Sequence, residues 1–163
     1  MRTLLILRHG QAAPEEAGSD RARPLTKRGV QAADLVGQLL LDDDLVPDRI
    51  ISSDAVRARS TARRVAAAAK FEGVIDELDE LYLAEPEAYI TAIQRLAGDA
   101  ECVLVVGHNP SLEALALVLT GEPVALPTAG LVVCSLPIPS FSELSLEVSG
   151  KMTRFARPKQ LAD

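Results

Sequence analysis

Two short apolar runs in the chain each end abruptly in a histidine beside a glycine. The run at 4–7 leads into Arg-His-Gly, and the run at 103–106 leads into Gly-His-Asn. Continuous apolar runs of this length, bounded by glycine, are typical of strands that are buried on both faces of a sheet. We therefore predict that both runs are buried strands. They would place His9 and His108, the two histidines of the chain, at strand ends.

Apolar positions with helical spacing predict four helices between and after these strands. In the first, Val30, Ala33 and Val36 would lie on one face. Each helix begins near a residue that is favoured at a helix N-terminus, such as serine, threonine, aspartate or proline. The expected helices run from the cap Thr26 to about Leu41, from a cap at Ser53 or Asp54 to about Lys70, from Pro86 to Gly98, and from Pro110 or Ser111 to Gly121.

Strands are predicted between and after the helices. The expected strands cover 3–8, 49–51, a short segment near 74–75, 102–106, 130–137 and 143–149, with a turn at 139–142. Residues 11–25 include two prolines and a glycine, which predict a long loop. Strands that alternate with helices and end in a strand pair indicate an α/β fold, a three-layer sandwich with a mostly parallel central sheet. The length of 163 residues fits a single domain, 1–163.

Composition and charge exclude several classes of function. Apolar residues make up 48% of the chain and charged residues 25%, which is ordinary for a globular protein. The net charge of −6 argues against a nucleic-acid partner. No apolar run approaches the roughly 20 residues that span a bilayer, and the first residues do not form a signal peptide, so no membrane partner is expected. Cys102 and Cys134 lie in apolar runs, as free cysteines of a reducing compartment do, and we expect a cytoplasmic protein.

Polar residues suited to phosphate chemistry follow the predicted strands. They are Arg8, His9, Gln11, Ser52, Ser53, Arg57, His108 and Asn109. In open α/β sheets, ligands bind beyond the carboxyl ends of the strands. Arginine matches two phosphate oxygens at once, a helix N-terminus favours an anion, and histidine can act as a nucleophile or proton carrier. The set therefore indicates a phosphate pocket that contains a nucleophile.

Competing chemistries lack their motifs in this sequence. There is no Gly-x-x-x-x-Gly-Lys-Ser/Thr loop, no Gly-x-Gly-x-x-Gly after a strand and no Gly-x-Ser-x-Gly elbow. A cysteine phosphatase needs Cys-x5-Arg, but the sixth residue after Cys102 is His108 and the sixth after Cys134 is Ser140. Two histidines with scattered acids do not resemble a zinc or two-metal site. Histidine is left as the candidate nucleophile.

Five motifs occur in order along nearly the whole chain. They are Arg-His-Gly at 8–10, Arg-Pro-Leu-Thr-x-Arg-Gly at 23–29, Ser-Ser-x-x-x-Arg-Ala-x-x-Thr at 52–61, Val-Gly-His-Asn-Pro at 106–110 and Arg-Pro-Lys at 157–159. The first matches the signature of the histidine phosphatase (phosphoglycerate mutase-like) superfamily. Together the five resemble its small SixA-type branch. Arg-His-Gly alone would be a weak signal, whereas five motifs in the family order are specific.

The resemblance implies a fold like that of phosphoglycerate mutase and a role for each matching residue. His9 would attack the phosphorus, become transiently phosphorylated and pass the group to water. Arg8 and Arg57 would hold the phosphoryl oxygens, and His108 would donate a hydrogen bond to the same group. Phosphoryl transfer depends mainly on positioning and charge stabilisation. Because arginines and imidazoles supply that charge, no metal or other cofactor is expected.

Three further residues are candidates for the border of the phosphate site. Gln11 and Asn109 follow the two strands that end in histidine, and Arg23 could add a third cation at the rim. Arg23 could instead pair with Asp20 or Glu16.

The group that protonates the leaving group is open. Larger members of the family use a carboxylate in a Leu-x-Glu context, which Leu78-Asp79-Glu80 matches, although Asp76 and Glu77 lie close by. Many SixA-type proteins do without this acid. A phosphoramidate leaving group can explain that, because its nitrogen, once protonated, leaves far more readily than an alkoxide.

Three functions remain as alternatives. The first is a phosphohistidine phosphatase that acts on a phosphorylated protein, such as a histidine phosphotransfer domain. The second is a phosphomonoesterase that acts on a small phosphoester with Glu80 as its acid, and the third is a non-catalytic phosphate-binding module. Only 50 residues separate Arg57 from His108, which is too few for the helical lid that larger relatives insert there. We therefore predict an open pocket, which favours the phosphohistidine phosphatase. The sequence does not determine the oligomeric state.

Overall fold

The computed structural model describes residues 1–14 and 18–158 of the chain, which build one six-stranded sheet. The strands are β1 (Arg2–Arg8), β2 (Arg49–Ser53), β3 (Ile75–Leu78), β4 (Cys102–Gly107), β5 (Leu131–Leu136) and β6 (Lys151–Ala156). Their order across the sheet is β3-β2-β4-β1-β5-β6. β3, β2, β4 and β1 are mutually parallel, and β5 runs antiparallel to both of its neighbours. The predicted mostly parallel sheet is confirmed.

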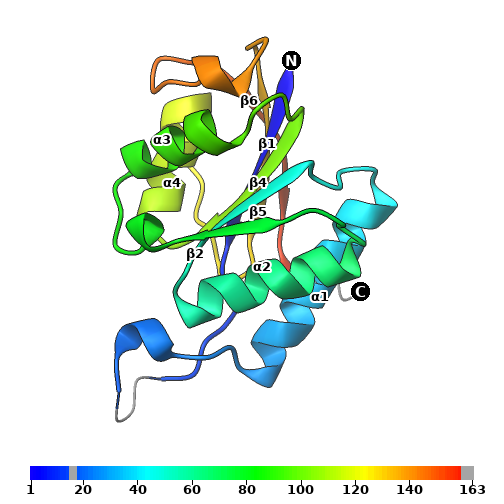
Figure 1. The fold of residues 1–163 in the computed structure, drawn as a ribbon, viewed down its shortest axis with the longest axis vertical. Coiled ribbons are helices and arrows are strands. Elements are labelled where there is room, and N and C mark those ends of the chain that lie inside the picture. Colours follow the sequence, from blue (N-terminus) through cyan, green and yellow to red (C-terminus); the bar gives the residue numbers. More distant parts are fainter. Residues whose placement is uncertain (15–17, 159–163) are drawn as a thin grey trace.

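Helices cover both faces of this sheet and complete the predicted three layers (Figure 1). The helices are α1 (Lys27–Asp42), α2 (Val56–Ala68), α3 (Pro86–Leu96) and α4 (Ser111–Thr120), with short 3₁₀ turns η1 (Asp20–Ala22), η2 (Asp79–Leu81) and η3 (Phe141–Glu143). The α1–α2 pair packs on one face, and α3, α4 and η3 pack on the other. Thr26 caps α1 as predicted, because its Oγ1 accepts a hydrogen bond from Gly29 N at 3.1 Å.

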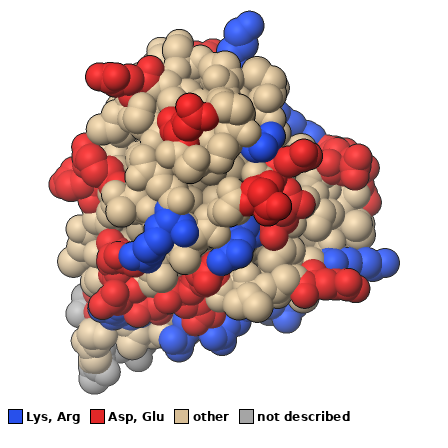
Figure 2. Space-filling view, turned by 45° about the horizontal axis from the view of Figure 1, so that its top comes forward, with Lys and Arg blue, Asp and Glu red and all other residues tan. Residues whose placement is uncertain are grey.

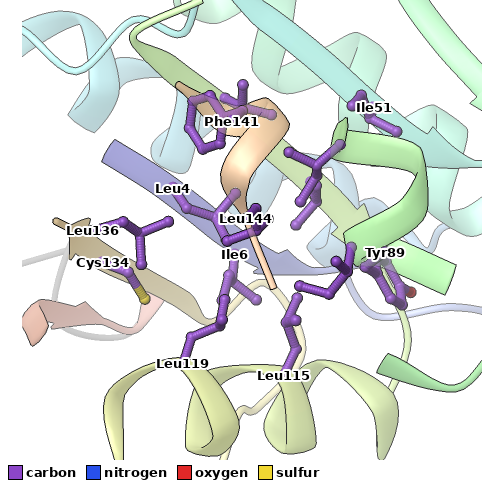
Figure 3. Close-up of a cluster of buried hydrophobic side chains, with 14 of the residues drawn as sticks. Leu4, Ile6, Ile51, Tyr89, Leu115, Leu119, Cys134, Leu136, Phe141 and Leu144 are labelled. Atoms are coloured by element: carbon purple, nitrogen blue, oxygen red, sulfur yellow. The ribbon is translucent and has the colours of Figure 1, made fainter. Parts of the chain in front are cut away.

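The central strand β1 divides its side chains between two hydrophobic clusters. Leu4 and Ile6 are fully buried toward α3 and α4, and Leu5 and Leu7 are fully buried toward α1 and α2. Figure 3 shows the first cluster, in which residues from the sheet, α4 and η3 converge. Burial of one such side chain stabilises the fold by about 1.5–3 kcal/mol. This buried strand fixes the position of the polar residues that follow it.

The predicted strand at 143–149 is wrong. Residues 141–143 form η3, the residues after them form an irregular segment, and the sixth strand lies later, at β6. The apolar alternation at 144–148 belongs to a segment that covers the α3–α4 face: Leu144 is fully buried there. β6 lies at the edge of the sheet and most of its residues are exposed or half-buried, so it lacks an apolar pattern.

The predicted cap of the second helix is also wrong. α2 has Ala55 as its N-cap, and neither Ser53 nor Asp54 fills that place. Ser53 is instead the last residue of β2 and is fully buried, and its hydroxyl contacts the site described below. The short strand expected near 74–75 begins at Ile75 and runs to Leu78.

The outside of the molecule mixes charges of both signs. Figure 2 shows acidic and basic side chains interspersed with broad uncharged areas on one face. No helix in the described part of the chain combines the length and the apolar character that crossing a membrane requires. Cys102 and Cys134 are free thiols in β4 and β5, and burial raises the pKa of each to about 12.

Candidate active site at the carboxyl edge of the sheet

The carboxyl ends of β1, β2 and β4 meet at a pocket of about 560 Å³. In the sheet register Arg8 lies opposite Gly107, so the residues that follow these two positions emerge side by side. The ring centres of His9 and His108 are 5.2 Å apart. The predicted residues in the pocket lining are Arg8, His9, Gln11, Arg23, Arg57, His108 and Asn109. The structure therefore brings together all of the predicted site residues except Glu80 and the two serines: Ser52 and Ser53 do not line the pocket, and Ser53 contacts it only through His108.

Close backbone packing holds the segment after β1 in place. Gly10 N donates a hydrogen bond to Thr61 Oγ1 of α2 at 2.9 Å. A Cβ atom on Gly10 would lie 2.8 Å from Gly29 O, and one on Gly29 would lie 2.2 Å from Gln11 O. Both contacts are with backbone, which cannot move aside cheaply. Glycine is therefore required at both positions, and the threonine and glycine of the predicted motifs have a structural role here.

His9 is held with one nitrogen protonated and the other free. Its Nδ1 lies 2.8 Å from Gly10 O, and because a carbonyl oxygen only accepts hydrogen bonds, Nδ1 must be the donor. Nε2 is then the nitrogen with the lone pair, and Arg57 Nε points at it from 3.4 Å. Burial, followed by the charges of Arg57, Arg8 and Arg23, lowers the pKa of His9 to about 4. The imidazole is therefore neutral near pH 7 and nucleophilic at Nε2.

His108 is the second neutral imidazole of the pocket. Its Nε2 lies 2.9 Å from Ser53 Oγ, which also accepts a hydrogen bond from Ala55 N at 3.2 Å. Its Nδ1 is buried and has no hydrogen-bond partner among the described residues. Burial, together with the nearby His9 and Arg57, lowers the pKa of His108 to about 3. An oxyanion in the pocket would give this ring an acceptor.

The residue before His108 is a glycine because a tyrosine occupies the adjoining space. A Cβ on Gly107 would lie 1.9 Å from the hydroxyl of Tyr89. That hydroxyl accepts a hydrogen bond from His108 N at 3.3 Å. Tyr89, which is fully buried, thus anchors the start of the second histidine segment.

Arg8 and Asn109 are joined through one carbonyl oxygen. Arg8 Nη1 and Asn109 Nδ2 donate to Leu126 O at 3.0 and 2.9 Å. Arg8 Nε is buried without a partner in the described part of the chain, and burial lowers the pKa of this guanidinium. Arg8 can therefore offer an unused N–H to an oxyanion. The side-chain amide of Asn109 therefore helps to hold the Leu126 carbonyl in place beside Arg8.

Asp20 is the centre of a polar network, of which the sequence predicts only the pair with Arg23. It pairs with Arg23 at 3.0 Å, which is one of the alternatives predicted for Arg23; the other, Glu16, lies outside the described residues. Arg57 also binds it, donating to its backbone oxygen at 2.8 Å and to its carboxylate at 3.0 Å. The Tyr82 hydroxyl donates to the same carboxylate at 2.6 Å. The bond from Tyr82, followed by that from Arg23, holds the pKa of Asp20 well below its usual range.

Glu80 does not lie in the pocket. Its carboxylate pairs with Arg95 at 2.7 Å, and both side chains are about half exposed. The neighbouring acids Asp76 and Glu77 pair with arginines elsewhere. The one carboxylate in the described lining of the pocket is Glu85, at the N-cap of α3.

The charges of the pocket favour an oxyanion. Three arginines and two neutral imidazoles line it, and guanidinium groups bind phosphate oxygens through charge-assisted hydrogen bonds. No group of three or more histidine, cysteine, aspartate or glutamate side chains within residues 1–14 and 18–158 is arranged to hold a metal ion.

Known proteins are similar to this chain in sequence and in fold. Residues 4–95 match the Histidine phosphatase superfamily (branch 1). An uncharacterized protein of Mycobacterium tuberculosis is 35% identical over 115 residues, which are 69% of each chain. The phosphohistidine phosphatase SixA of Escherichia coli is 30% identical over 109 residues, 66% of this chain and 67% of that one. A solved structure of the protein histidine phosphatase SixA complexed with tungstate superposes with a TM-score of 0.83 at 27% identity, over 98% of this chain and 99% of that one.

Proposed function

Because the chain belongs to branch 1 of the histidine phosphatase superfamily, we propose that it is a phosphatase that forms a phosphohistidine intermediate on His9. The proposal rests on one observation, the protonation and orientation of the His9 imidazole. This imidazole is neutral, its Nδ1–H is fixed to a carbonyl, and its free Nε2 lies beside Arg57 in an arginine-lined pocket. A histidine nucleophile requires this protonation state and this orientation.

In the first step His9 Nε2 attacks the phosphorus, the N–P bond to the enzyme forms and the bond to the leaving group breaks. In protonated phosphohistidine the leaving imidazole already carries a proton on its other ring nitrogen, so it departs as a neutral ring and no group of the protein has to supply one. In the second step water attacks the phosphorylated imidazole, which releases inorganic phosphate and restores neutral His9. Arg8 and Arg57 stabilise the charge on the phosphoryl oxygens in both steps. Its relative SixA binds tungstate, itself a tetrahedral oxyanion, which supports the assignment of the pocket to phosphate.

His108 assists as a hydrogen-bond donor. If the Ser53 hydroxyl donates to Nε2 of His108, the single proton of this neutral ring lies on Nδ1, the buried atom that lacks a partner in the described structure. A phosphoryl oxygen would then accept from it. No proton has to leave His108 during the reaction.

We propose that the substrate is phosphohistidine in a protein, as in a histidine phosphotransfer domain. The acid suggested by sequence, Glu80, is paired with Arg95 outside the pocket, so an alkoxide leaving group would lack that proton donor. A protonated imidazole leaving group does not need one. The pocket wall also presents Leu83, which is 83% exposed and has a backbone φ of 55°. An exposed leucine in a conformation that is unusual for its type fits contact with a protein partner.

The test compares the release of phosphate from a phosphorylated histidine phosphotransfer domain and from glucose 6-phosphate. We expect kcat/KM for phosphohistidine to be higher by at least about 100-fold, the smaller end of what an ester reaction loses when the carboxylate predicted as its general acid, Glu80, does not reach the pocket. Glu80→Gln should change neither activity by more than about twofold, as for an exposed ion-paired residue.

Equal rates on both substrates, with the ester activity alone lost in Glu80→Gln, would instead identify a small-molecule phosphomonoesterase. Binding of the phosphorylated domain without any turnover would identify a non-catalytic module. Arg95→Ala serves as a matched control, because it removes the partner of Glu80 without touching the pocket.

The low pKa of His9 predicts activity that persists into acidic solution. A nucleophile with a pKa of about 4 stays unprotonated at pH 5.5, where an imidazole with the ordinary value of about 6.5 would be mostly protonated. The acid limb of kcat/KM reports the free enzyme and is expected below about pH 5. Initial rates from pH 4.5 to 8, corrected for spontaneous hydrolysis and for titration of the substrate, provide the measurement. An acid limb centred near 6.5 would contradict the neutral, buried state of His9.

A further inference from the structure

A second hollow, of about 270 Å³, adjoins the catalytic pocket. The two share Gln11 and Thr128 in their linings, so they are neighbouring parts of one surface depression. The second hollow is built from the segment after β1, the first turns of α1, the segment before β5 and the residues after β6. Its remaining lining residues are Arg28, Ala32, Pro127, Arg157 and Pro158.

The charged residues of this hollow are both arginines. Arg28 and Arg157 have no carboxylate partner within residues 1–14 and 18–158, whereas eight other arginines there form ion pairs. Glu85, the acidic residue in the lining of the catalytic pocket, does not line the second hollow. In a chain with a net charge of −6, two guanidinium groups that pair with no carboxylate of the described residues, around a depression whose described lining has no acid, mark it as a site for an anion.

The start of α1 strengthens the positive charge at the hollow. Its first turn contains Lys27 and Arg28 and no acidic residue. A helix N-terminus carries a partial positive charge, so acidic residues stabilise this end and basic ones do not. Across the hollow, the Arg157 guanidinium lies 5.0 Å from the centre of the Phe155 ring, a contact that orients it. An anion bound between Arg28 and Arg157 would offset the unfavourable charge at the helix start.

We infer that this hollow binds an acidic side chain of the phosphorylated protein whose phosphoryl group enters the catalytic pocket; the inference rests on the proposed phosphatase function. A carboxylate can accept hydrogen bonds from a guanidinium through both of its oxygens. A phosphomonoester with a single anionic group would fill the catalytic pocket and leave the hollow empty. The hollow thus selects protein substrates that carry aspartate or glutamate beside the phosphohistidine.

The experiment uses two phosphohistidine peptides that differ only in the residues around the phosphohistidine: two glutamates on each side in one, two glutamines in the other. Wild-type protein should give a kcat/KM about tenfold higher for the acidic peptide, the effect of two exposed ion pairs of ordinary strength. Arg28→Glu combined with Arg157→Glu should reduce the ratio to one or below. Lys70→Glu, at an exposed site just after the end of α2, should leave the ratio unchanged. The preference should also shrink at 0.5 M salt, since exposed charges are screened.

A binding measurement separates this inference from the proposed function. The same two peptides, carrying a fluorophore, are titrated with His9→Ala, which cannot turn them over, and with His9→Ala that also carries both arginine reversals. We expect the acidic peptide to bind more tightly, and this difference to disappear with the reversals. That result supports an acidic-residue site in the hollow even if wild-type protein proves inactive. Hydrolysis of both peptides at equal rates, or a preference that survives both reversals, overturns the inference and leaves the phosphatase proposal standing.

Discussion

Replacing His9 with alanine is expected to reduce kcat/KM for phosphohistidine by at least about 10⁴-fold, because a missing nucleophile removes the covalent route altogether. His9 Nε2 carries the unprotonated lone pair and has only a long contact, of 3.4 Å, with Arg57 Nε. His108 does not replace it, because its Nε2 is directed at Ser53 Oγ, at 2.9 Å and outside the pocket lining. Rapid-quench labelling with a substrate carrying radioactive phosphate gives the direct measurement. Wild-type protein should show acid-labile, base-stable phosphate on His9, and His9→Ala should show none.

His108→Ala is the matched control for this experiment. It also removes a buried imidazole from the pocket but leaves the nucleophile, so labelling should still occur, at a lower rate. Urea unfolding of both variants checks that the loss is chemical, since each histidine is about 8% exposed and each substitution removes the same side-chain volume. Full turnover by His9→Ala would overturn the mechanism.

The arrangement of the site could be predicted from sequence because it depends on buried strands. Continuous apolar runs identify strands that are covered on both faces, and parallel strands present their carboxyl ends at a common edge. The prediction of 3–8 and 102–106 as such strands places His9 and His108 at the same edge of the sheet, and the pairing of β1 with β4 makes them neighbours there. The structure gives 5.2 Å between their ring centres. The family match then agrees with what the strand ends alone indicated.

Edge elements could not be predicted in the same way. β6 pairs on one side only and exposes most of its residues, so its sequence needs no apolar alternation. The segment at 144–148 has that alternation because Leu144 packs into the core from an irregular segment. Burial and hydrogen-bonded pairing are separate requirements, and a period-two pattern reports only the first. The predicted N-cap of α2 is wrong because the hydroxyl of Ser53 is buried and hydrogen-bonds to His108.

The contacts of side chains in the loops around the site could not be predicted from the sequence either. Tyr82 carries no family motif, and its contact with Asp20 at 2.6 Å joins residues that are far apart in the chain. The spacing Leu-x-Glu singled out Glu80, but η2 directs that carboxylate toward Arg95. A motif identifies which residues share a segment, whereas the direction of each side chain depends on the backbone turn that carries it.

Replacing Arg57 with alanine is expected to lower kcat/KM by about 10³-fold, in the range found when one preorganised donor to a transition-state oxyanion is removed. Arg57 is 6% exposed and directs Nε at His9 Nε2, the atom that bonds to phosphorus in the proposed reaction. Arg57→Lys should recover part of the loss, because an ammonium group keeps the charge but lacks the planar fork. Steady-state kinetics on phosphohistidine, with unfolding monitored in urea, provide the measurement.

Arg64→Ala is the matched control, because it removes an arginine from the same helix that pairs with Asp34 on the surface. Its activity should stay within about twofold of wild type, and its stability should fall by no more than about 1 kcal/mol. Arg57→Ala also removes one of three hydrogen-bond partners of the Asp20 carboxylate. The other two partners, Arg23 and Tyr82, remain. The network therefore keeps its loop in place, and a fall in kcat/KM with little change in unfolding would identify Arg57 as a group that acts on the phosphoryl oxygens. An equal loss in Arg57→Ala and Arg57→Lys, accompanied by unfolding, would instead mean that Arg57 serves to hold Asp20.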